Sequence, residues 1–350
     1  MVQSFSYDYD ALRVFATDVL KKAGLPEDRA FAGATTLLEA DLLGFPTHGM
    51  QRLSSNVKWL QNGQSRVSGE PIVIADKAAI FNWDANFLPG IWLVRMAVKE
   101  AITRAKTYGV ATATLRRCQH IASLAAYMPL ILEEGMVGMM MVSSPSEKTV
   151  SGPTTPQPAI SNNPIAFVAP AEPYPFLFDM SLASITNGGV TRAYQQGRKL
   201  PSATLQKVDG TFTDDPATFF EDPPSTIAPV GAPAQGYKGF VLSLMVEMLS
   251  SGLGNYGRGN LNDDEANVVF LQVFDPEAFG SKDALMEEVK TMRDALQKVD
   301  VKRTPGERSW QQRLDGLENG VQLSEDIVEL LKPVAEEFGL VLPSGQLVKS

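Results

Sequence analysis

The chain has 350 residues, of which 44% are hydrophobic and 20% are charged, as in a globular protein with an ample core. Its net charge of −9 argues against binding to nucleic acid or to an anionic membrane surface, because both require a basic face. No apolar run reaches the roughly 18 residues of a membrane span, and the N-terminus lacks a signal-peptide pattern. The single cysteine excludes an intramolecular disulfide, which is typical of a reducing compartment. We therefore expect a cytoplasmic protein.

The first 62 residues predict three helices. The first ends at Gly24-Leu25-Pro26, and the second runs over residues 27–43. The third begins near Thr47, which we expect to be its N-cap. The apolar residues that recur at helical spacing are Leu12, Phe15, Val19 and Leu20 in the first helix and Leu53, Val57 and Leu60 in the third.

From about residue 71 onward, short β runs alternate with helices. The expected strands cover residues 72–74, 78–83, 110–115, 137–142, 165–169, 176–178 and 268–273. The expected helices cover residues 90–108, 122–134, 239–251, 281–298 and 324–338. Residues 201–236 are rich in Pro, Thr, Asp and Gly, and indicate an extended surface excursion. This order predicts a mixed α/β middle with helical ends, and we expect the last helices to pack on the first.

The segment Gly252 to Gly257 matches the G-x-G-x-x-G pattern of dinucleotide-binding loops. The phosphate-binding form of that pattern needs a strand before it and a helix after it. Here a predicted helix precedes it and the polar stretch GRGNLNDDEAN follows. We therefore interpret the glycines as a helix exit, not as a Rossmann loop.

The stretch GFPTHGMQRL contains His48, one of two histidines in the chain. If Thr47 caps a helix, His48 and Arg52 lie at i and i+4 on one face. The guanidinium could then hold a carboxylate in a two-pronged hydrogen bond, and the imidazole could exchange a proton with a neighbouring oxygen. The alternative is that His48 bonds a neighbouring carbonyl and Arg52 is a solvated side chain. Spacing alone leaves both interpretations open.

The second histidine, His120, follows a predicted strand and precedes a helix rich in small residues. The carboxyl end of a strand that leads into a helix is where α/β proteins place ligands, but a structural role fits equally well. A nucleophilic pair of Cys118 and His120 is disfavoured, because residues two apart rarely face each other, so we expect an inert thiol. No metal-ligand spacing is present, and we predict no metal site.

Several segments together resemble the type-2 malate/L-lactate dehydrogenase family, which includes ureidoglycolate, L-sulfolactate, diketogulonate and Δ1-piperideine-2-carboxylate oxidoreductases. The resemblance covers about residues 8–340. Its landmarks, in chain order, are AD-x-x-G-x-x-[ST]-H-G-x-x-R-L at Ala40–Leu53, the segment around His120, SNNPIAF at Ser161–Phe167, FDMSLASITNGG at Phe178–Gly189, GYKGFVLSLMVEML at Gly236–Leu249 and RTPGER at Arg303–Arg308.

The resemblance implies an α/β (α+β) fold that is not of the Rossmann type, and a homodimer. Residues 1–70 and 255–350 would form a helical, substrate-binding and dimerisation domain, and residues 71–254 a central domain that binds NAD or NADP. His48, His120 and Thr47 would be catalytic, with His120 a proton acceptor or a cofactor contact. Substrate-binding residues would be Arg52, Asn162, Asn187 and Gly188. Cofactor-binding residues would be His120, Ile121, Ala122, Ser123, Leu124, Asp179, Met180, Ser181, Lys238, Arg303, Pro305, Gly306 and Glu307.

Three positions depart from the family pattern. Thr47 replaces the usual serine and keeps a hydroxyl beside His48. Ile121-Ala122 replaces the usual Phe-Gly, which reshapes a cofactor contact. Gly189 stands where relatives have Lys, or an Asp credited with a relay to the histidine. Either His48 works here without that partner, or this branch takes a different substrate.

These observations predict reversible hydride transfer between NAD(P)H and C2 of a small 2-oxo or 2-hydroxy acid. Arg52 would fix the carboxylate, and an imidazolium would meet the charge that develops on oxygen. One alternative is the reduction of a cyclic imino acid, disfavoured by Gly189. Another is a catalytically silent ligand-binding relative, disfavoured by the retained histidines and Arg52. A cysteine hydrolase is the most distant alternative.

Overall fold

The structure is a computed structural model, which describes residues 3–260 and 266–348. It contains two compact units. The first comprises residues 1–140, 166–178 and 271–350, and the second comprises residues 141–165 and 179–270. These units are defined by internal contacts. The two functional domains expected from the sequence, residues 1–70 with 255–350 and residues 71–254, differ in their bounds from these compact units. Their roles in substrate and cofactor binding remain predictions.

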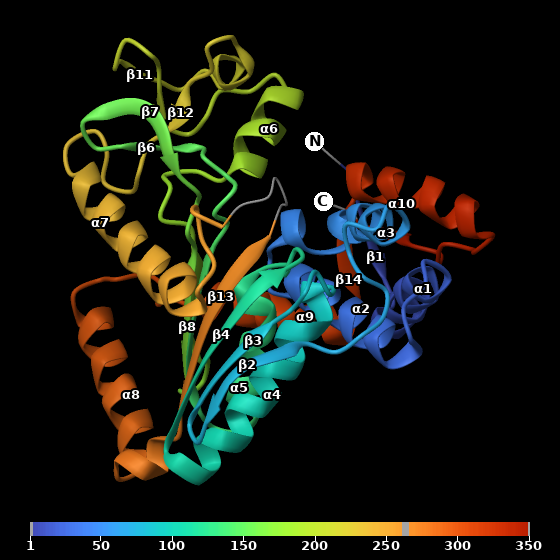
Figure 1. The fold of residues 1–350 in the computed structure, drawn as a ribbon, viewed down its shortest axis with the longest axis vertical. Coiled ribbons are helices and arrows are strands. Elements are labelled where there is room, and N and C mark those ends of the chain that lie inside the picture. Colours follow the sequence, from blue (N-terminus) through green and yellow to red (C-terminus); the bar gives the residue numbers. More distant parts are fainter. Residues whose placement is uncertain (1–2, 261–265, 349–350) are drawn as a thin grey trace. The chain divides into compact units, whose positions relative to one another are not determined.

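Helices from both ends of the chain build one core in the first unit (Figure 1). They are α1 (Tyr9–Lys22), α2 (Glu27–Leu42), α3 (Leu53–Gln61) and α10 (Glu325–Phe338), and the polar helix α9 (Glu307–Asn319) packs against α2. Leu12, Leu37 and Leu331 are fully buried in this core. The strands β14 (Val321–Ser324), β1 (Ser4–Tyr7) and β15 (Gln346–Leu347) form a small sheet beside it in that order. The expected packing of the last helices on the first is confirmed.

A seven-stranded sheet belongs largely to the first unit. Its strands, in spatial order, are β2 (Ile72–Lys77), β3 (Ile80–Asp84), β4 (Val110–Cys118), β13 (Asn267–Phe274), β5 (Val137–Ser143), β8 (Ile165–Ala169) and β9 (Phe176–Met180). Strand β3 runs parallel to β4 and antiparallel to β2. The sheet is therefore mixed, and its order is not that of a Rossmann fold. Each strand predicted from residue 72 onward is present.

Helices connect the strands of this sheet. Helix α4 (Gly90–Tyr108) packs against β4, and its bounds agree with the predicted helix. The predicted helix 122–134 is a 3₁₀ turn, η3 (Leu124–Tyr127), followed by α5 (Met128–Glu133). After β13 come η6 (Pro276–Phe279) and α8 (Lys282–Lys298). Among the described residues, no helix combines the length and the apolar character needed to cross a membrane.

The second unit contains a five-stranded sheet with its own core. Its strands, in order, are β11 (Phe212–Thr213), β10 (Leu205–Gln206), β12 (Thr226–Ile227), β6 (Val150–Gly152) and β7 (Thr155–Ile160). Its helices are α6 (Asn187–Gln195), η4 (Pro216–Phe220), α7 (Gly236–Glu247) and the π-helix η5 (Met248–Gly252). The expectation of a surface excursion at 201–236 is wrong, because Leu205 and Ile227 are fully buried in this core.

Two helices, α6 and α9, were not predicted. Both are polar, and the only fully enclosed residues are Val190 in α6 and Gly316 in α9, so neither shows a clear apolar period. The glycine pattern at 252–257 follows helix α7 and η5, which agrees with the helix-exit interpretation. Part of the polar stretch after it, residues 261–265, lies outside the described residues.

Candidate active site

The segment between α2 and α3 carries His48 and Arg52, but it is not one helix. It consists of two 3₁₀ turns, η1 (Pro46–His48) and η2 (Met50–Arg52), separated by Gly49, and α3 begins only at Leu53. The prediction of a helix that starts at Thr47 with His48 and Arg52 at i and i+4 is therefore wrong. Non-helical backbone at Gly49 (φ −94°, ψ −135°) interrupts the helix.

Local hydrogen bonds nevertheless bring Thr47, His48 and Arg52 together. The Thr47 hydroxyl lies 2.9 Å from Nδ1 of His48. Nε of Arg52 donates to the Thr47 carbonyl at 2.9 Å. Thr47 thus contacts both residues, as its expected role beside His48 requires, although it does not cap α3.

The carboxyl group of Asp41, on α2, packs against the two turns and is hydrogen-bonded to the second of them. Its Oδ2 accepts the Met50 N–H at 2.7 Å, and its Oδ1 is buried without a hydrogen-bond partner among the described residues. A β-carbon at Gly49 would lie 2.3 Å from the Asp41 carboxyl, so only glycine fits there. Burial raises the pKa of Asp41 to about 8, against the lowering effect of the Met50 hydrogen bond. At neutral pH this carboxyl is therefore mostly uncharged.

His120 lies in a tight loop after β4. The Ala122 N–H donates to Nδ1 of His120 at 3.2 Å, so a neutral His120 carries its proton on Nε2. The buried Tyr127 hydroxyl donates to the Ile121 carbonyl at 2.6 Å. Gly90, at the start of α4, packs under the loop, where a β-carbon would lie 2.2 Å from the Gln119 carbonyl oxygen. The loop is thus held from several sides, and its histidine has a defined tautomer.

The two histidines stack on each other. Their ring centroids are 5.9 Å apart and their planes differ by 17°. Trp59, on α3, stacks on His120 at 5.7 Å. Burial, and then the Arg52 guanidinium, lower the pKa of His48 to about 4. Burial, Arg52 and His48 lower the pKa of His120 well below its usual value. Both imidazoles are therefore neutral at pH 7 in the free protein.

Cys118 is fully buried in β4. Burial and the nearby Asp84 raise the pKa of its thiol far above the usual range. A thiolate nucleophile is thereby disfavoured, which supports the interpretation of an inert thiol.

The cofactor residues predicted in the first unit form two groups. Ile121, Ala122, Ser123 and Leu124 follow His120, and the Ser123 hydroxyl is buried without a partner among the described residues. The turn Pro305–Glu307 packs against the start of β9, where the Leu177 N–H donates to the Pro305 carbonyl at 3.4 Å. Gly306 (φ +97°) fits there because a β-carbon would lie 2.3 Å from the Pro175 carbonyl oxygen. The Arg303 side chain before this turn is exposed.

In the second unit, Asn162 and Ser181 are brought together. The Ser181 hydroxyl donates to the Asn162 carbonyl at 3.1 Å. Asp179 and Met180 precede Ser181 at the end of β9, and Met180 is 45% exposed. Lys238 is exposed on α7, with its ammonium 6.0 Å from the Tyr237 ring.

Asn187 and Gly188 form the first turn of α6. Thr186 caps this helix by accepting the Gly189 N–H at 3.1 Å. The Asn187 Oδ1 is buried without a partner among the described residues. A β-carbon at Gly189 would lie 3.0 Å from the Ile185 side chain, so this position admits a larger residue only with local adjustment.

Sequence reasoning assigned no role to Asp41 or Trp59. Asp41 lies within the family motif Ala40–Leu53, and its position shortly before two glycines, Gly44 and Gly49, is the sequence feature that could have indicated its role in the turn. Trp59 had no such signal, because its stacking on His120 depends on how α3 packs against the loop after β4.

Comparisons with known proteins fit this arrangement. The sequence profile described as malate/L-lactate dehydrogenase matches residues 7–332. The chain is 28% identical to an L-sulfolactate dehydrogenase from Methanocaldococcus jannaschii, covering 92% of this chain and 94% of that one. It is 25% identical to a Δ1-pyrroline-2-carboxylate reductase from Pseudomonas fluorescens, covering 94% and 98%.

The fold is also found in a solved structure. The crystal structure of malate dehydrogenase from Entamoeba histolytica superposes with a TM-score of 0.89 at 22% identity, covering 98% of this chain and 100% of that chain. The family match spans both compact units and includes the segments that carry His48, His120 and Asn162. The chain therefore belongs to the malate/L-lactate dehydrogenase family.

Proposed function

We propose that this protein is an oxidoreductase that transfers a hydride between NAD(P)H and C2 of a small 2-oxo or 2-hydroxy acid. The observation that supports this most directly is the stacked pair of His48 and His120 with Arg52 beside it. In a family of dehydrogenases and reductases, two imidazoles beside a guanidinium form a site that can bind a carboxylate and manage one proton.

Arg52 binds the substrate carboxylate in this proposal. Its Nε is anchored on the Thr47 carbonyl, so the planar guanidinium has a fixed orientation. The carboxylate held there places the neighbouring C2 oxygen near the imidazole of His48, which lies beside Thr47. The bound carboxylate also raises the pKa of His48, because its negative charge offsets the positive charge of Arg52, which lowers that pKa in the free protein.

His48 supplies the proton during reduction. When bound, the nicotinamide cofactor supplies or accepts the hydride. As C2 is reduced, negative charge grows on its oxygen, and an imidazolium at His48 protonates it. The Thr47 hydroxyl at Nδ1 orients the ring so that Nε2 is the nitrogen available to the substrate. In the reverse direction, neutral His48 accepts the hydroxyl proton.

The proposed cofactor residues are His120, Ser123, Asp179, Ser181, Lys238 and the turn Pro305–Glu307. The buried, unpartnered Ser123 hydroxyl supports a polar ligand at the loop after His120. The exposed Lys238 supplies positive charge suited to a phosphate. Preference between NAD and NADP depends on an arginine near the adenosine ribose, for which Arg192, Arg198 and Arg303 are candidates.

We propose a homodimer as the functional state. Helix α7 and η5 expose three large apolar side chains, Tyr237 (52%), Val241 (58%) and Met248 (67%). Association of two chains through these helices would cover this apolar surface. Light scattering at micromolar concentration is expected to give about twice the chain mass of 38.0 kDa. A mass near that of one chain would contradict the proposal.

A cyclic imino acid is the second candidate substrate, favoured by the 25% identity to a Δ1-pyrroline-2-carboxylate reductase. The same Arg52 would hold the carboxylate, and the proton would go to the ring nitrogen. Gly189 argues against this substrate, because a glycine cannot act as the relay that some relatives place there. The same glycine is compatible with a silent ligand-binding protein, against which the paired histidines argue.

A substrate screen tests these proposals. NADH and NADPH oxidation would be followed with pyruvate, oxaloacetate, 2-oxoglutarate, sulfopyruvate and Δ1-piperideine-2-carboxylate, with calorimetry of both cofactors in parallel. We expect cofactor binding and turnover with at least one 2-oxo acid. Turnover with the imino acid alone would favour the second candidate. Cofactor binding without any turnover would indicate a silent relative, and no binding at millimolar concentration would contradict the enzyme proposal.

A further inference from the structure

The two stacked histidines come from separate segments of the first unit, His120 from the loop after β4 and His48 from the turns before α3. Their distance therefore depends on how that loop is fastened to α3. Trp59, on α3, stacks on His120 at 5.7 Å with the two ring planes 28° apart. Ring stacking tolerates a range of offsets, so other contacts must set how the imidazole is turned.

Gln119 connects the loop directly to the segment after α3. The residue is only 4% exposed. Its Nε2 donates to the Gln64 carbonyl at 3.2 Å, and its Oε1 accepts the His120 N–H at 2.9 Å. Both halves of the buried amide are thus hydrogen-bonded to backbone, and the reversed amide would satisfy neither partner.

These contacts form a closed circuit around His120. The Ser65 N–H donates to the Trp59 carbonyl at 2.8 Å, so the segment that accepts the Gln119 amide is tied back to the helix whose indole covers His120. The circuit consists of Trp59, Ser65, Gln64, Gln119 and His120. A closed network restricts the ring more than a single contact does, because displacement of one member strains the others.

A buried carboxylate fixes the strand end that precedes Gln119. Asp84 ends β3, and its side chain is 2% exposed. It accepts Nε of Arg116 and Nε of Arg117, each at 2.8 Å. Burial raises the pKa of Asp84, but the hydrogen bonds from Arg117, from the Asn86 N–H and from Arg116 together hold that pKa below its usual value. The two ion pairs therefore keep a charged group at this buried place.

Arg117 forms the bend that leads to Gln119. Its backbone is left-handed (φ +52°), which is unfavourable for a residue with a side chain. The Arg117 carbonyl accepts the Phe87 N–H at 2.9 Å, and the Phe87 carbonyl accepts the Arg66 N–H at 2.9 Å. The ion pair with Asp84 and these backbone bonds thus hold the bend against the segment after α3.

We infer that Gln119 is a positioning residue, whose amide group holds the His120 imidazole in place against Trp59. The stack with His48 depends on that placement. This inference rests on the proposed function, in which His120 contacts the nicotinamide cofactor. Gln119 acts only through the backbone of His120 and touches neither substrate nor cofactor.

The His120 ring reports on this amide without any need for activity. The chain has two histidines, so a long-range ¹H–¹⁵N NMR spectrum shows two imidazoles, and His48→Gln assigns them. At neutral pH the wild-type His120 is expected in one tautomer with its proton on Nε2, because the Ala122 N–H donates to Nδ1. Gln119→Met, which is apolar and of similar length, should give a mixture of both tautomers, because the loosened loop no longer holds the ring.

Gln119→Asn is a milder second variant. It keeps the amide but is one methylene group shorter, so it cannot bond the Gln64 carbonyl and the His120 N–H together. It should mix the tautomers as well. In both variants the Kd of NAD(P)H should rise about three- to tenfold, the size of one hydrogen bond. The KM of the 2-oxo acid should change less than about twofold, because Arg52 is anchored separately.

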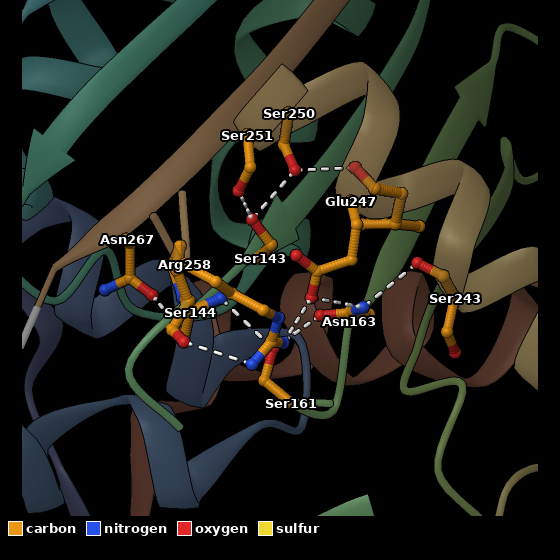
Figure 2. Close-up of polar contacts among 12 residues, drawn as sticks. Ser143, Ser144, Ser161, Asn163, Ser243, Glu247, Ser250, Ser251, Arg258 and Asn267 are labelled. Carbon is orange, nitrogen blue, oxygen red and sulfur yellow. Dashed lines mark hydrogen bonds and ion pairs between the residues drawn. The ribbon is translucent and has the colours of Figure 1, made fainter. Parts of the chain in front are cut away.

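Two controls separate positioning from stability. Gln272→Met removes another glutamine amide of the first unit, which donates to Thr112 Oγ1 at 3.0 Å near the start of β4. Ser250→Ala removes a buried hydroxyl of the second unit, which is hydrogen-bonded to Ser143 at 2.9 Å (Figure 2). Thermal unfolding should show a loss of stability in both. Both should keep the wild-type tautomer of His120, and Gln272→Met should keep the wild-type Kd of NAD(P)H.

The outcomes separate this inference from the proposed function. A single Nε2–H tautomer of His120 in both Gln119 variants, whatever their thermal stability, would overturn the positioning role. Mixed tautomers in the wild-type protein or in the two controls would overturn it as well, since the mixing would then not depend on the Gln119 amide. If the wild-type protein binds neither NADH nor NADPH, the proposed function itself fails, and the spectra still decide whether Gln119 positions the ring.

Discussion

The imidazole of His48 stacks on the imidazole of His120 at a centroid distance of 5.9 Å. Two imidazolium ions at this distance repel each other, so the pair accepts one proton at a time and titrates as a unit. Hydrogen bonds to Nδ1 distinguish the two rings, since His48 is bonded to a side-chain hydroxyl and His120 to a backbone N–H. The Thr47 hydroxyl can donate to neutral Nδ1 or accept from protonated Nδ1, so His48 keeps this bond when it gains a proton, whereas the backbone N–H at His120 can only donate.

Replacing each histidine tests which one donates the proton. His48→Ala should lower turnover by roughly 10²- to 10⁴-fold, the usual size of general acid catalysis, with little change in cofactor affinity. His120→Ala should weaken NAD(P)H binding and reduce turnover less. Steady-state kinetics and cofactor calorimetry measure both effects. Near-normal turnover in His48→Ala, beside an inactive His120→Ala that binds cofactor normally, would reverse the assignment.

Arg52→Lys should mainly weaken binding of the acid. Lysine has no Nε to anchor on the Thr47 carbonyl, and its ammonium cannot form a two-pronged bond with a carboxylate. We expect a rise in the KM of the acid of about tenfold or more, corresponding to at least 1.4 kcal/mol. Substrate titrations at saturating NAD(P)H measure it, with Lys58, an exposed residue of α3, replaced by Gln as the control. An unchanged KM would show that Arg52 does not bind the carboxylate.

Acid binding should be coupled to proton uptake. The pKa of free His48 is about 4, lowered by burial and by Arg52, so at pH 6–7 the ring is neutral. A carboxylate on Arg52 offsets that positive charge and raises the pKa, so the complex takes up a proton that the free protein does not hold. Affinity for the acid should then fall by up to tenfold per unit rise in pH between the two pKa values.

Calorimetry with oxamate in buffers of different ionisation enthalpy measures this uptake. The range below pH 7 is the informative one, because Asp41, on α2 beneath the same segment, titrates near pH 8. His48→Gln is expected to abolish most of the uptake. Binding of oxamate without proton release or uptake in the wild-type protein would contradict the coupling and leave carboxylate binding itself intact.

The lowered pKa of His48 also makes the free energy of unfolding decrease at acidic pH. The unfolded chain protonates His48 near pH 6.5, whereas the folded chain resists protonation down to about pH 4. Stability contributed by this group is therefore present above pH 6.5 and is lost as the pH falls toward 4. His48→Gln should flatten this acid limb, which denaturant unfolding between pH 7 and 4 measures.

Much of the fold could be predicted from sequence because local patterns agree with it. Helix α4 (Gly90–Tyr108) and strand β8 (Ile165–Ala169) match their predicted bounds. The 44–52 segment could not be predicted, because its two 3₁₀ turns depend on the Asp41 carboxyl filling the space beside Gly49. Pairing of the histidines could not be predicted from spacing either, because it depends on how the loop after β4 packs beside α3.

Gly49→Ala should disrupt the segment that carries both His48 and Arg52. The added β-carbon would lie 2.3 Å from the Asp41 carboxyl, and overpacking of this kind costs about 1–3 kcal/mol. Turnover should fall with stability, because the displaced backbone flanks both functional side chains. Gly259→Ala is the control, since its added methyl group meets open space. Combining Gly49→Ala with Asp41→Ser, which is smaller and keeps an acceptor, should recover part of the loss, and additive losses would contradict the proposed clash.

Ala122→Gly tests the departure from the family pattern at the loop after His120. Ala122 has a left-handed backbone (φ +62°), which glycine adopts without strain. Relief of about 1 kcal/mol of strain should offset most of the loss of its buried methyl group and the entropy of a glycine, together roughly 1.5 kcal/mol. The free energy of unfolding should therefore change by less than about 1 kcal/mol. Ala126→Gly, at a fully buried position of η3, has no strain to relieve and should lose the full amount. Equal losses in the two variants, measured by denaturant unfolding, would show that Ala122 is not strained.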